Sequence, residues 1–268
     1  MTPMFSQLPD LNASFLQYLT LLALCSTRLM VVMNVFPPTG DSVLQGLGRN
    51  AAALVWSLNI AYGQAALIPQ LHGTFLVCVA VKEAIIGLVI GYAASIIFWA
   101  AESIGTYIDD VSGYNNAQMT NPTNGQQVSI TSTLLSQCMM TSFWMLGGMM
   151  YLLGAIYESY HWWPLASVMP VGANIIETFA LRQTDTLMLI VAKVAAPATA
   201  ILVLVDIAFG IVSKSAQRLD ISTLGHSVKG LLCVLMLALL IGVFIDQVHG
   251  QIALTDISAQ MRALAQGK

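Results

Sequence analysis

The chain has 268 residues and a net charge of −3, and 57% of its residues are apolar while only 9% are charged. Ordinary soluble domains carry about 25% charged residues, so this composition excludes that class and indicates an integral membrane protein. The slightly negative charge provides no basic surface, which excludes nucleic acid as a partner. We therefore expect an all-α, multi-helix membrane-associated protein of roughly six to eight segments.

The first half of the chain contains three predicted helices. The first covers about residues 12–36 and stops at Pro37 and Pro38, because proline cannot continue a helix. The second covers about 42–64, and the third covers about 74–108. Within the third, residues 84–101 give 18 positions without charge, which is enough for a membrane-spanning helix.

The second half contains three further predicted helices and one shorter piece. We expect helices over about 131–157, 184–213 and 227–248, with an amphipathic piece near 172–182 before the middle one. Pro197 lies in the middle of the 184–213 segment and is expected to kink it. The tail, 250–268, is mildly polar and can lie as a helix on a surface.

An aromatic cluster follows the 131–157 segment and comprises Tyr160, His161, Trp162, Trp163 and Pro164. Aromatic side chains gather at the interfaces of membranes, which is one interpretation of this cluster. Ordinary packing against a neighbouring helix explains it equally well, so both interpretations stay open.

The most unusual segment lies between Asp110 and Glu158, where no side chain is charged. Its first part, the polar segment 111–133, reads VSGYNNAQMTNPTNGQQVSITST and is rich in Asn, Gln, Gly and Thr. Surface loops commonly carry charge, whereas hydrogen-bonding groups without ions suit a pore constriction or a plug. Irregular backbone at membrane depth is tolerated only where protein or a water-filled cavity surrounds it.

Five charged residues lie within apolar segments: Arg28, Lys82, Glu83, Lys193 and Asp206. A charge at the bilayer centre costs about 3 kcal/mol or more, so we expect protein to shelter these helices or their ends to extend beyond the lipid. Lys82 and Glu83 point about 100° apart on a helix, so each is expected to need its own partner, which another chain can supply. The alternative for Lys82 is extension of its side chain from a segment end into water.

Glu83, Gly87 and Gly91 share one helix face at a spacing of four residues. The Gly-xxx-Gly pattern permits a second backbone to approach closely, so this face is a predicted packing site. Gly105 and Gly113 lead from here to the polar segment, where glycine provides either freedom to move or room for tight turns.

We find no sequence motif for catalysis, a cofactor or a metal ion. The four cysteines, Cys25, Cys78, Cys138 and Cys233, have no metal-ligand spacing, so we interpret them as small buried apolar side chains. The four histidines are scattered, and no hydrolase, zinc-protease or nucleotide-binding pattern occurs. We expect no enzyme activity and no cofactor.

The connection between the last two long helices is basic, with Lys214, Arg218 and Lys229 against Asp220. Basic loops face the cytoplasm, so we expect this loop there, and the other loops fix no topology. The N-terminus lacks a basic region and a small-residue cleavage site before its apolar run, so we interpret it as uncleaved.

Two groups of residues follow one another along the chain in the order found in a known family. The first contains Glu83, Gly87, Gly91, Phe98, Glu102, Gly105, Ile108, Asp109, Gly113, Asn121, Pro122, Gly125, Gln126 and Gln127. The second contains Pro197, Asp206, Gly210, the run from Lys214 to Asp220, Leu224 and Lys229. Together they resemble the FliR/SctT family, the export-gate subunits of flagellar and injectisome type III secretion. The Asp109-Asp110 pair and Gln126-Gln127 favour an injectisome member.

The resemblance implies a non-catalytic subunit of a helical gate in the bacterial inner membrane, through which unfolded polypeptides are secreted. Its partners would be FliP/SctR-like and FliQ/SctS-like subunits, an SctU-like switch protein and membrane lipid. Residues 1–183 would resemble the first partner's helical fold, and 184–268 the second partner's hairpin with a C-terminal tail.

The resemblance also implies that a loop of the chain plugs the channel until a substrate arrives, and this role falls on residues 110–129. The candidate plug residues are Gly113, Tyr114, Asn115, Asn116, Gln118, Met119, Asn121, Pro122 and Gly125. The candidate assembly residues are Glu83, Gly87, Gly91, Pro197, Asp206, Lys214 and Lys229.

Two other functions compete with protein export. A small-solute membrane transporter would show an inverted repeat with broken helices in corresponding halves, and Pro197 has no clear counterpart in the first half. The third function is that of a membrane enzyme or an assembly factor, although an enzyme would need convergent polar groups. Co-purification with homologous gate subunits, against purification alone with a bound solute, would separate export from solute transport.

Overall fold

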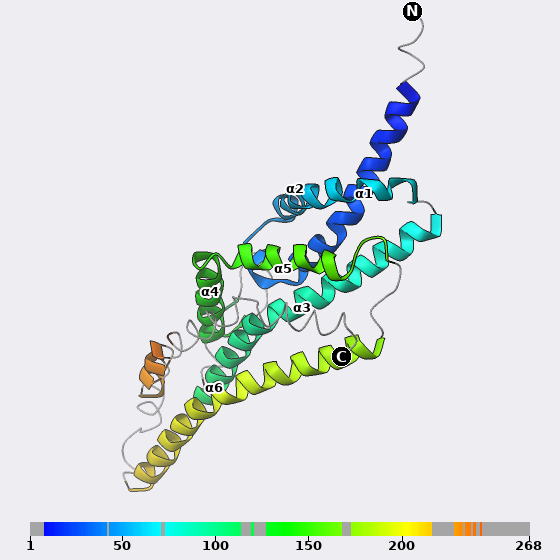
Figure 1. Cartoon of the computed structure of the whole chain (residues 1–268). Helices are drawn as coiled ribbons and strands as arrows, with labels where there is room; N and C mark the ends of the chain where they lie inside the picture. The colour runs from blue at the N-terminus through cyan, green and yellow to red at the C-terminus, as the bar shows by residue number, and fades with distance from the viewer. Residues whose placement is uncertain are drawn as a thin grey trace, which may run out of the picture. The chain divides into compact units, whose positions relative to one another are not determined.

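The computed structural model describes residues 8–41, 43–70, 73–113, 119–120, 127–167 and 173–215, and beyond them 228–232, 234–236, 238–239 and 242. The described residues are almost entirely helical (Figure 1), which confirms the predicted all-α class. The strands among them are only two residues long.

The described residues form the following elements in chain order. They are α1 (Leu8–Val35), η1 (Pro37–Thr39), α2 (Gly46–Gly63), η2 (Ala65–Gln70), α3 (Gly73–Ser112), β1 (Met119–Thr120), β2 (Gln127–Val128), α4 (Ile130–Met145), α5 (Gly148–Trp162) and α6 (Ala173–Ser215). The first three predicted helices correspond to α1, α2 and α3.

The predicted stop at Pro37 and Pro38 is confirmed, because these residues form η1 immediately after α1. Thr39 completes the end of α1: its hydroxyl donates to the carbonyl of Met33 at 2.8 Å and to that of Phe36 at 3.0 Å. The last carbonyl groups of a helix lack partners within the helix, and the threonine hydroxyl provides one for Met33; the Phe36 carbonyl also accepts from the backbone N–H of Thr39 at 3.1 Å.

The chain separates into two compact units. The first holds the described residues of Met1–Ser95 and Met150–Ala180, and the second holds those of Ile96–Met149 and Leu181–Ala253. Helix α3 therefore contributes to both units in turn. These boundaries differ from those of the predicted regions 1–183 and 184–268, whose likeness to two partner folds stays a prediction.

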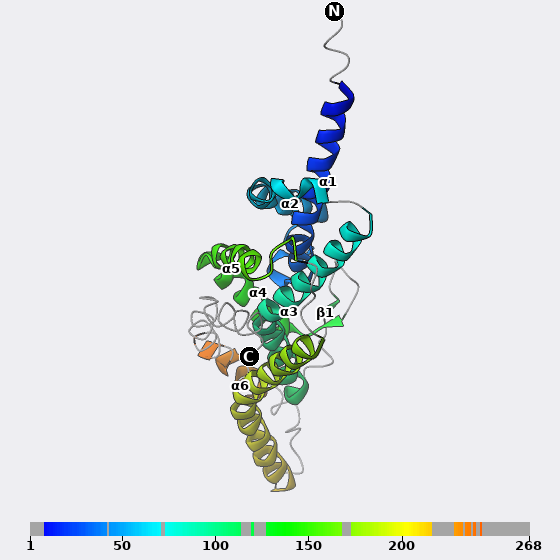
Figure 2. The same cartoon turned by 45° about the vertical axis from the view of Figure 1, so that its right-hand side comes forward.

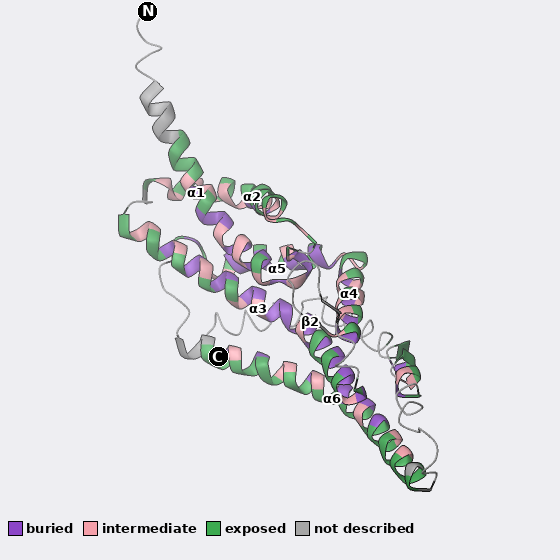
Figure 3. Cartoon of the chain, turned by 180° about the vertical axis from the view of Figure 1, so that it is seen from behind, coloured by how far each residue is buried: buried purple, intermediate pink, exposed green. Residues whose placement is uncertain are grey.

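The core of the first unit consists of apolar side chains that recur every three or four residues, as in an amphipathic helix. In α1 they are Leu21, Cys25, Leu29, Val32 and Met33, and Phe36 follows directly after the helix; all six are at most 1% exposed. Ile86 and Ile90 of α3 and Leu152 and Ile156 of α5 are buried as well. Figure 3 shows the buried residues as purple bands along α1 and α3.

The core of the second unit includes the later part of α3 and helix α4. Phe98 of α3 and Phe143 of α4 meet edge to face, with ring centroids 5.8 Å apart. Leu135 and Met139 of α4 are also buried. Gly148 leaves room for this packing, because an added Cβ would lie 2.3 Å from the ring of Phe143.

Among the described residues, three helices are long and apolar enough to cross a membrane: Phe15–Val35 within α1, Gly73–Ser112 and Glu177–Val212 within α6. The pair α4 and α5 would add a fourth crossing if it forms one broken span. The apolar window of α3 is 67% buried within the chain, whereas that of α6 is 22% buried. Most residues in the apolar window of α6 are therefore not buried by the described part of the chain.

The predicted single helix over 131–157 is wrong, because this stretch forms α4 and α5 with a break at Leu146 and Gly147. Gly147 has a φ of +70°, a left-handed conformation that glycine adopts without the steric cost of a Cβ. Apolar side chains continue through the break, so hydrophobicity alone does not reveal it. Helix α5 then runs to Trp162, so the first three residues of the aromatic cluster are helical.

The predicted separate piece at 172–182 is also wrong, because it forms the first part of α6, which continues to Ser215. Gln183 and Thr184 join the two predicted segments, and neither residue is a strong helix breaker. Pro197 lies inside this continuous helix. Figure 1 shows that the ribbon of α6 changes direction along its length.

The polar segment starts in the last turn of α3 and continues through β1 and β2. Gly113 follows α3 with a φ of +81°, as a left-handed residue after a helix. Strand β1, labelled in Figure 2, pairs with β2 in antiparallel register, with Met119 opposite Val128. Residues 114–118 and 121–126 lie outside the described part of the segment.

Candidate functional site

Two groups of polar side chains connect distant parts of the chain to α3, one group in each unit. We call Arg28, Lys82, Glu83, Ser159 and Tyr160 the buried charge cluster, and Asp109, Ser129 and Thr131 the Asp109 junction. The cluster lies in the first unit, and the junction lies in the second, where the polar segment begins and ends.

Arg28 of α1 and Glu83 of α3 form the centre of the buried charge cluster, and both residues are 0% exposed. Arg28 Nε donates to Glu83 Oε2 at 2.7 Å, and Nη2 donates to Oε1 at 2.9 Å. A bidentate contact between guanidinium and carboxylate is among the strong hydrogen-bonding arrangements in proteins. It neutralises both charges inside an apolar unit.

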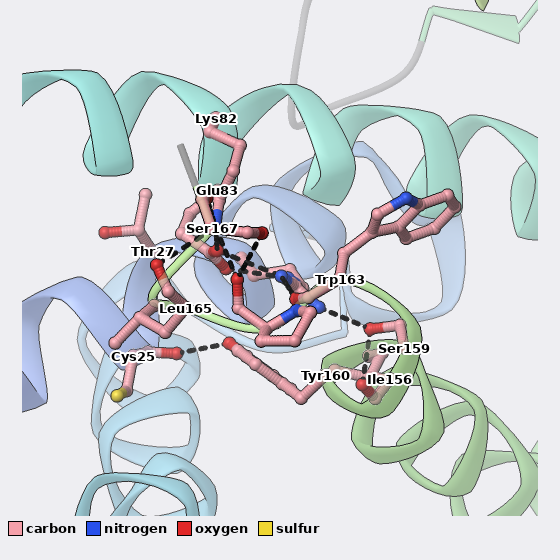
Figure 4. Close-up of polar contacts among 12 residues, drawn as sticks. Cys25, Thr27, Lys82, Glu83, Ile156, Ser159, Tyr160, Trp163, Leu165 and Ser167 are labelled. Carbon is pink, nitrogen blue, oxygen red and sulfur yellow. Dashed lines mark hydrogen bonds and ion pairs between the residues drawn. The ribbon is translucent and has the colours of Figure 1, made fainter. Parts of the chain in front are cut away.

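Arg28 has further partners at the end of α5 (Figure 4). Nη1 donates to Ser159 Oγ at 2.7 Å, and Nη2 donates to the carbonyl of Trp163 at 3.1 Å. The guanidinium carbon lies 3.7 Å from the ring centre of Tyr160, which is a cation–π contact. The Tyr160 hydroxyl donates to the carbonyl of Cys25 at 2.8 Å. All three guanidinium nitrogens therefore have partners within the chain.

Lys82 binds the turn that follows α5. Its Nζ donates to the carbonyls of Pro164, Leu165 and Ser167 at 2.8, 3.2 and 2.8 Å, and lies 3.1 Å from Glu83 Oε1. Lys82 and Glu83 each have a partner of their own, as expected, but the long Lys82 side chain also reaches its neighbour's carboxylate, which was not expected. The alternative for Lys82, extension into water, is wrong, since Lys82 is 4% exposed.

The buried charge cluster contains two cations and one anion, and backbone carbonyls balance the remaining positive charge. Carbonyls at the C-terminal end of a helix carry partial negative charge, and the acceptors of Lys82 follow directly after α5. The cluster therefore joins α1, α3 and the end of α5. Its partners lie in the same chain rather than in another, and because its charged groups are used for packing, we interpret it as a structural anchor.

Gly87 and Gly91 bring α3 close to the backbone of α1. A Cβ added at Gly87 would lie 2.6 Å from the carbonyl oxygen of Arg28, and one at Gly91 would lie 3.2 Å from Val32 Cα. A larger side chain at either position would displace α1. These contacts lie within the chain, and the part that the two glycines play in assembly stays a prediction.

The packing interpretation of the aromatic cluster applies to its residue Tyr160, which is 8% exposed and contacts Arg28. Trp163 contributes its carbonyl to the same contacts, whereas His161 is exposed at the end of α5. The alternative, a membrane-interface belt, therefore does not describe the cluster as a whole.

The Asp109 junction lies at the C-terminal end of α3, where Asp109 is 5% exposed. Its Oδ2 accepts from Ser129 Oγ at 2.5 Å and from the backbone N–H of Thr131 at 2.9 Å, and its Oδ1 accepts from the Thr131 hydroxyl. One carboxylate thus binds residues that follow it in the sequence by 20 and 22 positions.

The junction also forms the N-terminus of α4. Ser129 caps this helix, because its Oγ accepts from the backbone N–H of Ser132 at 3.2 Å. Asp109 satisfies the Thr131 N–H, another donor that the first turn of a helix leaves unpaired. Gly105, one turn earlier on α3, lies against the same place, because an added Cβ would be 2.3 Å from Ser132 Cα. The backbones of α3 and α4 are therefore in direct contact.

The structure describes only part of the predicted plug. Gly113 is exposed after α3, and Met119 belongs to β1. The others lie outside the described residues: Tyr114, Asn115, Asn116, Gln118, Asn121, Pro122 and Gly125. The role of all these residues stays a prediction.

The remaining predicted assembly residues lie on α6 and after it. Pro197, Asp206 and Lys214 are exposed on α6. Lys229 is 9% exposed and forms an ion pair with Asp206. The described residues around Lys229 therefore lie beside α6, as in a helical hairpin, and the hairpin as a whole stays a prediction.

One expectation about the cysteines is wrong. Cys25 is buried and Cys138 is partly exposed, but Cys78 is exposed. The cause is its position on the outward face of α3, where Val77 and Val81 are exposed as well. Cys233 lies outside the described residues.

Sequence reasoning identified the charged residues but missed their partners. Ser159 and Thr131 have no predicted role, and Asp109 has none beyond its place in the family pattern. A usable signal does exist for Ser129, because a serine directly before an apolar run is a typical helix N-cap. No comparable local signal connects Ser159 to Arg28.

Comparison with known proteins places these sites in a wider group. The family profile of bacterial export proteins, family 1, matches residues 19–255. Yop proteins translocation protein T of Yersinia pestis is 35% identical over 158 residues, which cover 59% of this chain and 60% of the relative. Secretion system apparatus protein SsaT of Salmonella typhimurium is 30% identical over 155 residues, 58% of this chain and 60% of the relative.

A flagellar relative matches over a greater length at lower identity. Flagellar biosynthetic protein FliR of Escherichia coli is 23% identical over 257 residues, which cover 94% of both chains. The chain thus spans about three fifths of the length of the Yersinia and Salmonella relatives and nearly all of the E. coli one.

Proposed function

We propose that this chain, which belongs to the bacterial export proteins, family 1, is a core subunit of the export gate of a type III protein secretion system. The observation that carries the proposal is the family match over residues 19–255. The names of the relatives refer to Yop protein translocation, a secretion system apparatus and flagellar biosynthesis. We favour an injectisome over a flagellum, because identity is 35% to the Yop translocation protein and 23% to E. coli FliR.

We infer a non-catalytic subunit that lies in the bacterial inner membrane together with FliP/SctR-like and FliQ/SctS-like subunits and an SctU-like switch protein. The three helices long enough to cross a membrane support the membrane location. The low burial of α6, 22% over its apolar window, supports contacts with lipid or with partner subunits. Within such a gate, residues 1–183 would take the place of a FliP/SctR-like subunit and 184–268 that of a FliQ/SctS-like hairpin.

We further propose that the polar segment seals the gate while it is idle and yields to an unfolded polypeptide during export. Its side chains hydrogen-bond without carrying charge, so they can exchange partners without leaving a buried charge unpaired. Gly113 already has a left-handed backbone, and Pro122 and Gly125 favour turns. A segment that contains such turn-favouring residues suits a movable seal better than a helix does.

Co-expression tests the gate-subunit proposal. The chain is expressed alone, and then with FliP/SctR-like and FliQ/SctS-like subunits from an injectisome of the same bacterium. Because α6 leaves its apolar surface largely uncovered, we expect heterogeneous or aggregated material from the chain alone and a discrete complex from co-expression, measured by size-exclusion chromatography in detergent. A monodisperse, thermally stable monomer that ignores the partner subunits would contradict the proposal.

A further inference from the structure

We propose that Asp109 is the positioning residue that fixes both ends of the polar segment at one point, and that the idle seal depends on its carboxylate. The inference rests on the proposed function, because it assumes that the polar segment forms the seal. It adds a residue outside the predicted plug and gives that residue a defined task.

Asp109 joins the two ends of the polar segment. Asp109 lies just before the polar segment, on α3, whereas Ser129 and Thr131 lie at the segment's far end, where α4 begins. The contacts at 2.5 Å and 2.9 Å therefore join the two places at which the segment leaves and re-enters the helices. A segment tied in this way is held as a closed loop, and its ends cannot move apart while the contacts persist.

Two further contacts hold the ends of the polar segment together independently of Asp109. Gly105 and Ser132 bring the backbones of α3 and α4 together one turn away from the carboxylate. On the other side, β1 and β2 pair with each other, with Thr120 opposite Gln127. Along the chain the junction lies between these two contacts, so Asp109 belongs to a series of contacts that hold the two ends of the polar segment together.

The contacts of Asp109 are of a kind that can open and re-form. The described donors to Asp109 are two hydroxyls and one backbone N–H, and none of these three carries a charge. The positive end of the α4 dipole favours the carboxylate at this place. Such contacts hold a segment firmly, yet water can replace each hydroxyl in turn, which suits a seal that must give way and re-form.

The test uses the complex with its partner subunits and measures ion conductance across the membrane while no substrate is supplied. Asp109→Ala removes every contact of the carboxylate and should raise idle conductance about tenfold or more, because several charge-assisted hydrogen bonds are lost. Glu102→Ala is the matched control: it removes another acid of α3, which is exposed and lies outside the plug region, and should leave conductance unchanged. Recovery of the complex should be the same for both variants.

A cross-link separates positioning from folding. In a background from which the four cysteines have been removed, Asp109→Cys with Thr131→Cys replaces the hydrogen bonds by a disulfide. We expect this variant to leak when reduced and to seal again when oxidised. A residue that serves only to fold the protein would not make conductance follow the state of the bond.

Each outcome decides between the inference and the proposed function. If Asp109→Ala assembles and stays as tight as the parent, the inference is wrong. A second variant that lacks residues 112–124 tests the seal itself: leakage there beside a tight Asp109→Ala variant would leave the proposed function intact. If both variants are tight, the polar segment is only a connector.

Should Asp109→Ala fail to assemble, the milder variants Asp109→Asn and Thr131→Val are tested by the same conductance measurement. Parental conductance in both variants would overturn the inference.

Discussion

The buried charge cluster and the Asp109 junction both attach a distant segment to α3, but they use different partners. In the cluster, Arg28 and Lys82 lie 2.7 Å and 3.1 Å from Glu83, and all three side chains are at most 4% exposed. In the junction, hydroxyls and one amide surround the carboxylate of Asp109. Removing one member of a buried ion pair leaves an unpaired charge, whereas water can replace a lost hydroxyl. The difference indicates a permanent attachment in the first unit and an exchangeable one in the second.

The largest effect should come from breaking the ion pairs of the cluster. Glu83→Ala leaves Arg28 and Lys82 buried without their anion, which costs roughly 3–5 kcal/mol. We expect recovery of the intact complex to fall sharply and its thermal midpoint in detergent to drop. The control is Glu102→Ala, which removes an exposed acid from the same helix. Equal recovery of Glu83→Ala and the parent would show that the cluster is not an anchor.

A smaller effect should follow from adding one methyl group at a helix contact. Gly87→Ala and Gly105→Ala would place a Cβ 2.6 Å and 2.3 Å from backbone atoms of the facing helix, and overpacking of this kind costs about 1–3 kcal/mol. We expect both variants to lower the thermal midpoint of the complex, one in each unit.

The control for these glycines is Gly154→Ala in α5, where an added Cβ meets no atom within 4 Å. This substitution should be neutral or slightly stabilising, because alanine favours a helix over glycine by about 1 kcal/mol. If all three variants have the same thermal midpoint, an added methyl group at Gly87 or Gly105 does not disturb helix packing, and the prediction is wrong.

The smallest effect is expected where the cluster uses a hydroxyl instead of an ion. Tyr160→Phe keeps the ring beside Arg28 and removes only the hydrogen bond to the Cys25 carbonyl, so the loss should be about 1 kcal/mol. Tyr157→Phe is the control, because its hydroxyl donates to Trp56 from an exposed position. A loss as large as that of Glu83→Ala would mean that the type of partner does not determine the strength of the attachment.

Much of the fold follows from local pattern, because helix propensity and apolar periodicity act over a few residues. The stop after Phe36, the long apolar helix around 84–101 and the non-helical backbone at Gly113 were all accessible in this way. The break at Gly147 was not, since a single glycine in a uniformly apolar stretch is compatible with a continuous helix.

Of the candidate site, the sequence predicted only the charged residues within apolar segments and the glycines of the packing face. Arg28 and Glu83 are separated by 55 residues, and Arg28 and Ser159 by 131. Pairings between residues so far apart in the sequence depend on how the helices pack, and this packing cannot be read from the local pattern of one sequence. The same limit applies to Asp109, whose partners lie beyond the whole polar segment.

The order of the cluster's residues along the chain has a consequence for biosynthesis. Arg28 leaves the ribosome long before Glu83, and the acceptors at Ser159 and Trp163 are made 131 and 135 residues after Arg28. Helices α1 and α3 therefore reach the insertion machinery before the turn that completes their charge pairing exists. During this interval water, lipid head groups or the insertion machinery itself must solvate the arginine and the lysine. Synthesis of α5 is thus the step at which the first unit can close around its charges.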